Sequence, residues 1–533
     1  MKLILNLAVI YFNCLNIFSQ PPAVQWQKLY GGSGTDGFSD GINTLDGGFI
    51  FVGGTNSNDG DVNGNHGGID VWIVKVDSSS NIQWQRCYGG TSNESAMGID
   101  TTTDGGYIIE AYTQSNDGDV TGYHGGNDYW ILKIDNIGSL IWQKCLGGTE
   151  YEIPGSVHPT NDRGYIVGGV TLSNDGDVSG LHGTLGNFDF WVLKLDSAGF
   201  IQWQRCLGSY SPEERCKVIL SKDNKFVASG FSSGNNDGDV TCFQHGSGDY
   251  WVVKLDTNGA IINQNCFGGS GGDQGYTIAL CKDGGFIIGG ASNSSDGDVT
   301  GIHGVNPYRP DYWILKTDSL LNLQWEKCFG GSDIEIPTTI RQTNDSGYIV
   351  TGWTDSNDGN VTGNHSTGFA PDFWTVKLDR YGNFEWQRAS GGIESETENS
   401  IIQTIDSGYL IIGGTLSTDG DLTGISNHGN GDAWIMKLFP SSTEIPSIVG
   451  NFIGFDSYFD INHNLALNFY SNFDESIQVI LYEITGRILI SQTLVVTEGL
   501  NTMKVCAGEQ SKGMYIVSLV TKRGSVKKKV IMD

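Results

Sequence analysis

A short motif recurs seven times along this chain and constrains the fold more than any other feature. It is an aspartate, a tryptophan two residues later and a lysine three residues after that, as in Asp70-Val71-Trp72-Ile73-Val74-Lys75. Successive copies lie 58 to 62 residues apart, which predicts a repeat architecture with one supersecondary unit per period. The tryptophans are Trp72, Trp130, Trp191, Trp251, Trp313, Trp374 and Trp434, and the lysines are Lys75, Lys133, Lys194, Lys254, Lys316, Lys377 and Lys437.

Each period contains four segments with strand character, separated by turn signals. In the second copy, residues 96–102, 107–112, 128–135 and 140–145 are the expected strands, and they are called here the first to fourth strands of the repeat. Asp104-Gly105-Gly106 predicts a tight turn, because glycine adopts the positive φ that such turns need. The 77 glycines and the low charged fraction of 17% also suit turn-rich β structure.

A second tryptophan marks the fourth strand in six of seven places, and Asn263 stands where the seventh is expected. Thirteen of the 14 tryptophans therefore occupy two repeat positions. Large aromatic residues at a fixed strand position are expected to pack neighbouring units together rather than to bind a ligand. The fourth-strand residues are Trp26, Trp84, Trp142, Trp203, Trp325 and Trp386.

The two ends of the repeat region complement each other. The region begins with a fourth strand at residues 23–29, and its seventh copy stops after a third strand at Leu438. The N-terminal strand would then complete the last unit, which predicts an all-β fold: a seven-bladed β-propeller without an open sheet edge. A linear β-solenoid is the alternative, but it needs capping units and leaves the complementary ends unexplained.

The repeats resemble the bacterial β-propeller repeat family (SBBP-like proteins). The matching residues include Tyr30-Gly31-Gly32-Ser33, Val52-Gly53-Gly54-Thr55 and residues 70–77, and the resemblance extends over residues 24–438. It implies the propeller fold for residues 20–439. It implies no function, because the family shares none.

The N-terminus and the charge indicate an exported protein. Residues 1–19 start with Lys2 and continue as an apolar run to Phe18, which predicts a secretory signal peptide cut before Gln20. No later apolar run approaches the roughly 18 residues of a spanning helix, so no transmembrane segment is expected. The net charge of −29 lies almost wholly in the repeats and disfavours nucleic acid as a partner.

The loops between the second and third strands hold the candidate metal ligands. In the first copy Asp59, Asp61 and Asn63 alternate, and Asp70 follows eleven residues after Asp59. Alternating oxygen ligands beside a glycine are typical of calcium loops, so the spacing supports a calcium hypothesis, and the second copy repeats it. The candidate ligands are Asp59, Asp61, Asn63, Asp70, Asp117, Asp119, Thr121 and Asp128.

A structural role for the same loops is the alternative to calcium. Later copies drift in spacing, no glutamate closes any of them, and Cys242 replaces a glycine. Asp and Asn in short loops also bind their own backbone, and a histidine could brace the third strand through its aspartate. Symmetric copies would hold the histidines too far apart for one zinc site. These loop histidines are His66, His124, His182, His245, His303, His365 and His428.

In antiparallel units these loops and the connections to the next unit emerge on one face. Acidic residues in the connections predict a polar, acidic rim that suits a polysaccharide or protein ligand, or a cation. A glycosidase needs two carboxyl groups in unlike surroundings, which near-identical copies do not offer. Only Glu152, His158 and Tyr308-Arg309 stand out as departures. The acids are Asp36, Glu94, Glu150, Glu152, Glu213, Glu214, Asp273, Asp333, Glu335, Glu394 and Glu396.

Five cysteines share one repeat position and are expected to be small buried residues, since equivalent sites on successive units lie too far apart to pair. Three more, Cys216, Cys242 and Cys281, could include a disulfide, but their odd number fixes no pairing. The five are Cys87, Cys145, Cys206, Cys266 and Cys328.

A different pattern follows a linker at residues 440–451. Residues 452–533 are expected to form a small immunoglobulin-like β-sandwich, with strands at 477–484 and 514–521. Residues 479–487, Gly499-Leu500-Asn501 and 512–517 resemble the type A sorting domain of type IX secretion cargo. The resemblance implies the type IX machinery as a partner, and export through periplasm and outer membrane to release or surface attachment. An ordinary binding module is the alternative.

Together these features predict an exported, non-enzymatic binding or adhesion protein. No cofactor is expected apart from the hypothetical calcium. A secreted glycan-active hydrolase or lyase on the same scaffold is one alternative, and a purely structural surface protein is another.

Overall fold

The structure, a computed structural model, describes residues 20–440 apart from 184–185, 235, 305–307 and 366–369. Beyond the linker it describes residues 452–459, 464–471, 475–483, 487–497, 499–506, 513–521 and 524–532. The predicted signal peptide and most of the predicted linker lie outside these ranges. In the described ranges the only helical segment is the short 3-10 helix η1 (Gly420–Leu422), so the expectation of an all-β protein is confirmed.

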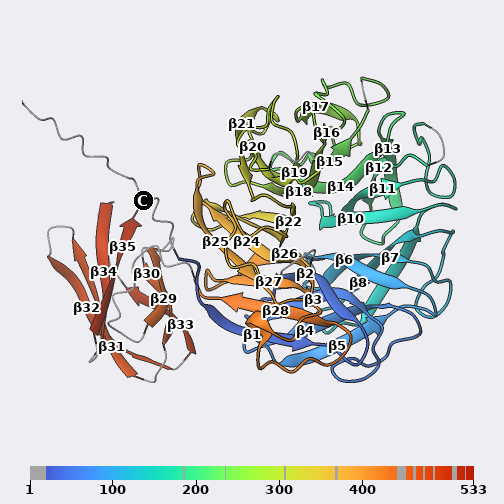
Figure 1. Ribbon diagram of the computed structural model, residues 1–533. Helices are drawn as coiled ribbons and strands as arrows, with labels where there is room; N and C mark the ends of the chain where they lie inside the picture. The colour runs from blue at the N-terminus through green and yellow to red at the C-terminus, as the bar shows by residue number, and fades with distance from the viewer. Residues whose placement is uncertain are drawn as a thin grey trace, which may run out of the picture.

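Residues 24–438 form seven four-stranded antiparallel sheets, numbered here along the chain (Figure 1). Sheet 1 consists of β2 (Asp36–Asn43), β3 (Phe49–Thr55), β4 (Asp70–Val76) and β5 (Ile82–Tyr88), and sheet 2 of β6 (Glu94–Thr101), β7 (Tyr107–Thr113), β8 (Asp128–Ile134) and β9 (Leu140–Leu146). Sheet 3 consists of β10 (Glu152–Pro159), β11 (Tyr165–Thr171), β12 (Asp189–Leu195) and β13 (Ile201–Leu207), and sheet 4 of β14 (Glu213–Leu220), β15 (Phe226–Ser232), β16 (Asp249–Leu255) and β17 (Ile261–Phe267).

The remaining sheets follow the same order, except that the last one borrows a strand from the N-terminus. Sheet 5 consists of β18 (Asp273–Leu280), β19 (Phe286–Ser292), β20 (Asp311–Thr317) and β21 (Leu323–Phe329), and sheet 6 of β22 (Glu335–Gln342), β23 (Tyr348–Thr354), β24 (Asp372–Leu378) and β25 (Phe384–Ser390). Sheet 7 consists of β26 (Glu396–Gln403), β27 (Tyr409–Thr415), β28 (Asp432–Leu438) and β1 (Val24–Tyr30).

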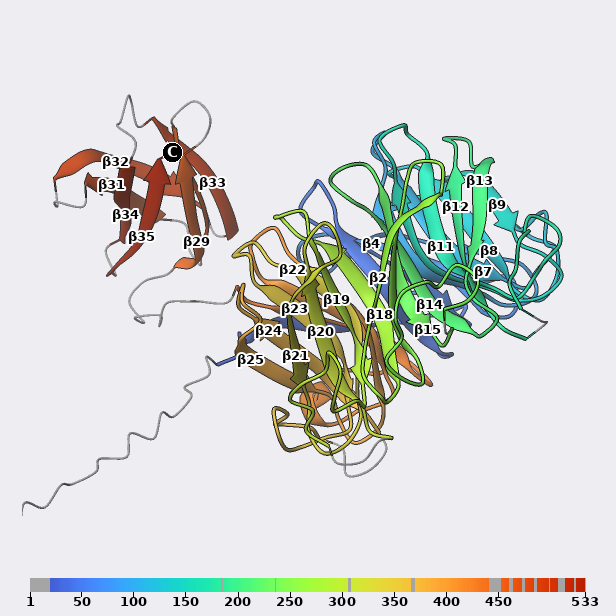
Figure 2. The same ribbon diagram turned by 90° about the horizontal axis from the view of Figure 1, so that it is seen from above.

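The sheets form a closed, propeller-like ring. The first strand of each sheet contacts the first strand of the next, and β26 of sheet 7 contacts β2 of sheet 1. Figure 2 shows the same ring turned by 90°. Several hydrogen bonds join sheets 7 and 1 at the closure: for example, the Asn399 side-chain amide donates to Phe38 O at 2.8 Å, and Ser400 Oγ donates to Asp40 Oδ1 at 2.7 Å.

The N-terminal strand completes sheet 7, as the complementary ends of the repeat region led us to expect. β1 pairs with β28 in antiparallel register, with Leu29 opposite Trp434 and Tyr30 opposite Ala433. Leu29 is buried and occupies the position that Cys87 holds in β5. The two ends of this 415-residue region are therefore held side by side by strand pairing.

Leu29→Asp is expected to destabilise the ring as strongly as Cys87→Asp, the equivalent change in sheet 1, whose four strands are consecutive in the sequence. Either change buries a carboxylate without a partner, at a cost of about 3 kcal/mol or more. Thermal unfolding of mature protein (residues 20–533) measures both variants. A neutral Leu29→Asp beside a destabilising Cys87→Asp would mean that β1 contributes nothing to the ring.

The two repeated tryptophans pack successive sheets together, as predicted. All seven third-strand tryptophans are fully buried, and Trp191 of sheet 3 lies with its ring centroid 4.8 Å from that of Tyr129 in sheet 2. Four of the fourth-strand tryptophans lie beneath a glycine in a turn of the next sheet: a Cβ on Gly138, for example, would stand 2.8 Å from the Trp84 ring. The other three of this kind are Trp142, Trp203 and Trp325. In place of the missing tryptophan, the Asn263 amide donates to Leu320 O at 2.6 Å.

The repeated lysine has a role that the sequence did not reveal. Lys75 Nζ lies 2.7 Å from Asp46 Oδ2, in the turn between the first and second strands, and its side chain is almost fully buried. The same ion pair recurs in every sheet and fixes each third strand to that turn. The seven pairs are Lys75–Asp46, Lys133–Asp104, Lys194–Asp162, Lys254–Asp223, Lys316–Asp283, Lys377–Asp345 and Lys437–Asp406.

The C-terminal part forms two further sheets that share a hydrophobic core. Leu465, Leu467 and Phe469 of one sheet cluster with Ile477, Val479 and other residues of the second. The strands predicted at 477–484 and 514–521 correspond to β31 and β34. One sheet has the order β29 (Phe452–Phe459), β30 (Asn464–Ser471), β33 (Gly499–Cys506), and the other β32 (Ile488–Val496), β31 (Glu475–Glu483), β34 (Gly513–Thr521), β35 (Gly524–Met532).

Candidate functional site: the loop face of the ring

One face of the ring carries both the loops between second and third strands and the connections between sheets; we call it the loop face. Backbone hydrogen bonds tie the two sets of segments together. Ser33 N, in the connection to sheet 1, donates to Asp59 Oδ1 at 2.7 Å, and Thr91 N donates to Asp117 Oδ1 at 2.8 Å. The expectation that both sets emerge on one face is therefore correct.

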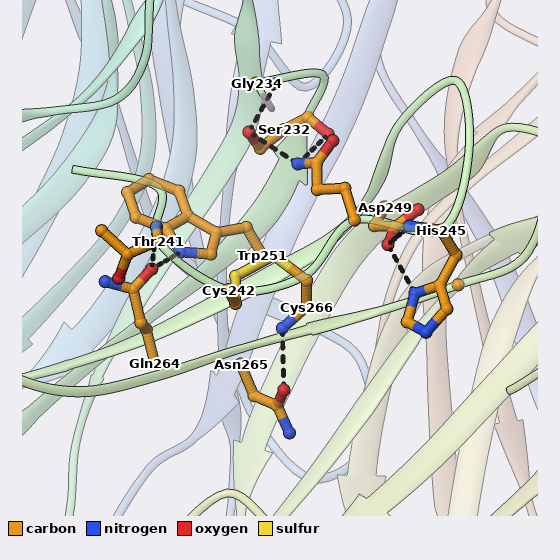
Figure 3. Close-up of a disulfide and its surroundings, with 12 residues drawn as sticks. Ser232, Gly234, Thr241, Cys242, His245, Asp249, Trp251, Gln264, Asn265 and Cys266 are labelled. Atoms are coloured by element: carbon orange, nitrogen blue, oxygen red, sulfur yellow. Dashed lines mark hydrogen bonds and ion pairs between the residues drawn. A yellow bond between two sulfur atoms is a disulfide. The ribbon is translucent and has the colours of Figure 1, made fainter. Parts of the chain in front are cut away.

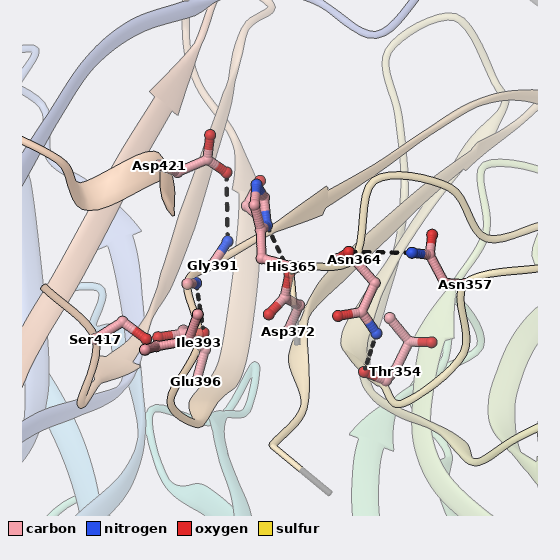
Figure 4. A network of polar contacts seen from close by, with 12 residues as sticks. Thr354, Asn357, Asn364, His365, Asp372, Gly391, Ile393, Glu396, Ser417 and Asp421 are labelled. Carbon is pink, nitrogen blue, oxygen red and sulfur yellow. Dashed lines mark hydrogen bonds and ion pairs between the residues drawn. The ribbon is translucent and has the colours of Figure 1, made fainter. Parts of the chain in front are cut away.

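The loop histidines brace the third strands in all seven sheets. His365 Nδ1 lies 2.8 Å from Asp372 Oδ2, which also accepts the His365 backbone N–H at 2.8 Å (Figure 4). The loops therefore have the structural role that was considered as the alternative to calcium binding: each histidine braces the third strand through its aspartate. The corresponding pairs are His66–Asp70, His124–Asp128, His182–Asp189, His245–Asp249, His303–Asp311 and His428–Asp432.

The calcium candidates of the first loop are engaged in separate contacts. Asp59 Oδ1 accepts the Ser33 N–H, Asp61 Oδ2 lies 3.4 Å from Gly31 N, and Asp70 Oδ2 accepts the His66 N–H. The backbone carbonyl of Asn63 accepts the amide of Gln85, so each candidate ligand already serves a different part of the scaffold.

The second loop repeats this arrangement. Asp117 accepts both the N–H and the hydroxyl of Thr91, Asp119 Oδ2 lies 3.3 Å from Gly89 N, and Asp128 Oδ2 accepts the His124 N–H at 2.8 Å. Thr121 accepts the Gln143 amide through its carbonyl and its hydroxyl. The described part of the chain contains no group of three or more His, Cys, Asp or Glu side chains that could hold a metal ion.

Calcium binding by these loops therefore stays a hypothesis, which a chelator tests. Because hydrogen bonds already hold the loops, EDTA is expected to leave the melting temperature of the mature protein unchanged. A ligand that binds only the folded state raises its stability, so a clear fall in melting temperature, reversed by added calcium, would establish bound calcium instead. Magnesium readdition serves as the matched control.

Seven of the acids expected on the rim are buried instead. Glu396, for example, accepts the Gly392 N–H at 3.1 Å and the Thr415 hydroxyl at 2.8 Å (Figure 4). Their positions in the connections predicted that these residues lie on the surface. The sequence does not show that each one accepts hydrogen bonds from the connection beside it and is buried there. The buried acids are Asp36, Glu94, Glu152, Glu213, Asp273, Glu335 and Glu396.

Each buried acid faces the third-strand aspartate of the preceding sheet across a glycine. A Cβ on Gly330 would stand 2.5 Å from Glu335 Oε2 and 2.7 Å from Asp311 Oδ1, so the two carboxyl groups converge there. Asp311 Oδ1 is buried without a hydrogen-bond partner. Burial, with a smaller contribution from the nearby Asp311 charge, raises the pKa of Glu335 to about 7.

Enough acids remain exposed to keep the loop face negative. Glu150 and Glu394 are exposed, and Asp59 and Asp117 are exposed at the loop tips. Since the buried acids and their partners repeat in every sheet, they serve the scaffold. A ligand on the loop face would therefore meet the exposed acids and the exposed residues that break the repeat.

Cys242 and Cys266 form a disulfide in sheet 4, beneath the loop that carries His245 (Figure 3). The expectation that all five repeated cysteines are unpaired is wrong for Cys266. The pairing arises because Cys242 replaces the loop glycine that otherwise lies over the repeated cysteine: a Cβ on Gly64 would stand 4.0 Å from the Cys87 Cβ. The cysteines Cys87, Cys145, Cys206, Cys216, Cys281 and Cys328 are free and buried.

The departures from the repeat noted in the sequence have separate places. His158 Nδ1 lies 2.8 Å from Asp100 Oδ2, between the first strands of sheets 3 and 2. Arg309 forms an ion pair with Asp333 on the loop face. Glu152 is one of the seven buried acids and is not a departure. These residues do not come together in one site.

Sequence reasoning overlooked Glu110, the most unusual carboxyl group of the ring. It lies in β7, is fully buried, and neither carboxyl oxygen has a hydrogen-bond partner. Burial raises its pKa well above the usual value, against the opposing effect of Lys217. The signal was present in the sequence, since the equivalent positions are Val52, Gly168, Ser229, Gly289, Thr351 and Ile412.

Comparison with known families identifies the kind of domain that the C-terminal residues form. Residues 459–533 match the family model described as "Secretion system C-terminal sorting domain". These residues are a secretion sorting domain. The match confirms the expected type IX sorting signal, and the sorting domain implies interaction with the type IX machinery, export, and secretion or attachment at the cell surface. No helix among the described residues is long and apolar enough to cross a membrane.

No curated protein matches the chain, which is similar to several solved structures at low sequence identity. It is similar to BBS1N, solved in complex with ARL6DN, with a TM-score of 0.41 and 11% identity over 80% of this chain and 98% of that one. It is also similar to the apocarotenoid oxygenase of Synechocystis, with a TM-score of 0.37 and 12% identity over 92% and 97%. Likenesses this weak say nothing about function.

Proposed function

We propose that the protein is an exported seven-bladed β-propeller that binds or adheres to a partner through its loop face and is not an enzyme. In this proposal an immunoglobulin-like sorting domain delivers it through the type IX pathway. One observation carries the proposal: the repeated histidines and buried acids of the loop face serve the scaffold, whereas the same face also presents exposed residues that break the repeat, such as Tyr210 and Phe243.

The repeated carboxyl groups argue for binding over catalysis. Each third-strand aspartate is fixed by a histidine, and each connection acid is fixed by glycine, serine or threonine donors, in all seven sheets. A pair of carboxyl groups that works as acid and base needs unlike surroundings and access to substrate. These pairs have like surroundings and are buried.

One observation supports a second candidate, a glycan-active enzyme on the same scaffold. Glu110 is buried with a raised pKa, whereas Asp40 accepts a hydrogen bond from Ser400 and lies 3.5 Å from Arg341. These two carboxyl groups, one in β7 and one in β2, have unlike surroundings. The buried state of Glu110 counts against it, because substrate would have to reach the carboxyl group. A purely structural surface role is the remaining candidate.

A surface-binding assay with matched charge variants tests the proposal. Labelled mature protein (residues 20–533) is incubated with cells of the producing organism and with isolated surface polymers. Glu150→Lys with Glu394→Lys adds lysines to the loop face, while Ser78→Lys with Ala198→Lys adds two to exposed turns between third and fourth strands, away from the loop face. We expect retention to fall several-fold for the first pair alone.

Two results would contradict binding by the loop face. Equal loss of retention in both pairs would indicate nonspecific charge effects, and no retention of the wild type would favour a purely structural role. Assaying the same polymers for released products separates the enzyme, since turnover abolished by Glu110→Gln would establish catalysis.

A further inference from the structure

Four large aromatic side chains project from one sector of the loop face. Tyr151, Tyr210, Phe243 and Tyr308 have exposed fractions of 47, 66, 78 and 84%. We call these four residues the aromatic arc. A single exposed ring is common on a protein surface, as Phe200 and Tyr381 show on the opposite face. What distinguishes the arc is that its four rings lie on successive segments of one face.

The arc does not follow from the repeat. At the position of Tyr210 five of the other six connections have serine or threonine, and the sixth has Ile393. At the position of Tyr151 none of the other six connections has an aromatic residue. Since the other sheets fold with small or polar residues at these positions, the scaffold does not require the rings.

The four residues follow one another around the ring. Tyr151, in the connection between sheets 2 and 3, pairs through its backbone with Asn127. Tyr210, in the connection between sheets 3 and 4, accepts the Asn187 amide at its carbonyl at 2.8 Å. Phe243 lies in the loop of sheet 4, and Tyr308 in the loop of sheet 5. The other half of the loop face carries the aliphatic residues Ile393 and Leu416 instead.

The loop that presents Phe243 is the one that the disulfide fixes. Cys242 directly precedes Phe243 and is bonded to Cys266 in β17 (Figure 3). The Phe243 ring also meets the His245 ring edge to face, with centroids 5.0 Å apart. A contact residue held in place before binding loses less entropy when the ligand arrives, and this is the benefit of the disulfide at this position.

The surroundings of the arc select the chemistry of its ligand. Acidic residues on the loop face, such as Glu150, repel polyanions, so acidic glycans, nucleic acid and anionic lipid are unfavourable. The rings stand on four separate segments of the chain, next to polar residues such as Glu150, Ser211, Gln244 and Arg309. Protein partners instead bury contiguous apolar surface. The four rings suit a repeating ligand with an apolar face for each ring and hydroxyl groups for the polar residues between.

We propose that the aromatic arc binds an uncharged polysaccharide, with Tyr210 and Phe243 as its central contacts. This inference rests on the proposed function and names the ligand class and the sector of the loop face. It assigns the arc to binding alone, with no chemical step.

Affinity electrophoresis of the mature protein in gels containing neutral polysaccharides (xylan, mannan, mixed-linkage glucan) or acidic polygalacturonate tests the inference. Wild type is expected to be retarded by at least one neutral polysaccharide and not by polygalacturonate. Tyr210→Ala with Phe243→Ala should weaken that binding at least ten-fold. Ile393→Ala with Leu416→Ala, which removes two exposed side chains from the other half of the face, should leave it unchanged.

The possible outcomes distinguish a failure of this inference from a failure of the proposed function. Retardation that survives in the aromatic double variant, or that is lost equally in both pairs, overturns the arc as the site. Wild type that binds no neutral polysaccharide, or binds a purified surface protein instead, overturns the ligand class, while retention on cells still supports the proposed function. Unchanged melting temperatures of both double variants confirm that exposed positions were altered without unfolding.

Discussion

Deletion of residues 459–533 is expected to leave the protein in the periplasm of a cell that secretes by the type IX pathway. Because residues 459–533 are a secretion sorting domain, we expect the fraction outside the outer membrane to fall from most of the protein to almost none. Cell fractionation and immunoblotting of the truncated and complete chains measure the distribution.

Two control proteins make this result interpretable. A full-length chain with Tyr210→Ala should still leave the cell, because an exposed residue of the ring has no role in sorting. A reporter protein with a signal peptide at its start and residues 459–533 at its end should be exported. If the truncated chain reaches the medium as efficiently as the complete one without cell lysis, another segment carries the signal.

The folded ring is expected to be most stable in mildly acidic solution and to weaken as pH rises toward 7. Burial raises the pKa of Glu213, Glu335 and Glu396 to about 7 and that of Asp189 to about 6. Between the ordinary carboxyl pKa and these values, the folded chain keeps protons that the unfolded chain has released. The free energy of unfolding therefore falls with rising pH in this window.

The opposite shift sets the acidic limit. Hydrogen bonds from Thr102 and Lys133 lower the pKa of Asp104 to about 2, so its stabilising effect is present above the ordinary carboxyl pKa and is lost below it. The maximum stability is thus expected at about pH 4 to 5. Urea unfolding at a series of pH values measures the profile.

Glu335→Gln isolates one carboxyl pair. A glutamine carries no charge, and its amide can donate to Asp311 Oδ1, which has no partner. The amide nitrogen cannot accept the Gly331 N–H as the carboxyl oxygen does, and this loss is the same at every pH. Compared with its difference from wild type at pH 4.5, the variant is therefore expected to gain roughly 2 kcal/mol at pH 8, since each unit of pKa shift corresponds to about 1.4 kcal/mol. Glu150→Gln, at an exposed position, is the matched control. A stability profile that is flat from pH 4.5 to 8 would mean that these groups do not hold protons in the folded chain.

The repeat made most of the fold predictable. Regular spacing of Trp72 and its equivalents predicted the units, turn residues such as Gly105 placed the strands within two residues, and incomplete ends predicted the pairing of β1 with β28. The sorting domain was recognisable from motifs such as Gly499-Leu500-Asn501. Local patterns of this kind are independent of long-range contacts, which is why they could be read from sequence.

The chemistry of the loop face was less predictable. The acid at Glu335 looked like a surface residue, because sequence spacing does not show that Gly331, Thr354 and Asp311 surround it. Cys242 and Cys266 are 24 residues apart and pair only because the loop folds back over β17. Burial and pairing of this kind depend on how neighbouring sheets pack, and one copy of the repeat does not contain that information.

The borrowed strand of sheet 7 has a consequence for the order of events during biogenesis. Residues 24–30 are synthesised long before residues 432–438, which supply the strand that they pair with. Until then β1 has no partner strand and the ring cannot close. The last strand of the ring, at residues 432–438, directly precedes the linker and the sorting domain in the sequence. By the time the sorting domain has been synthesised, the chain therefore contains every strand that the ring needs.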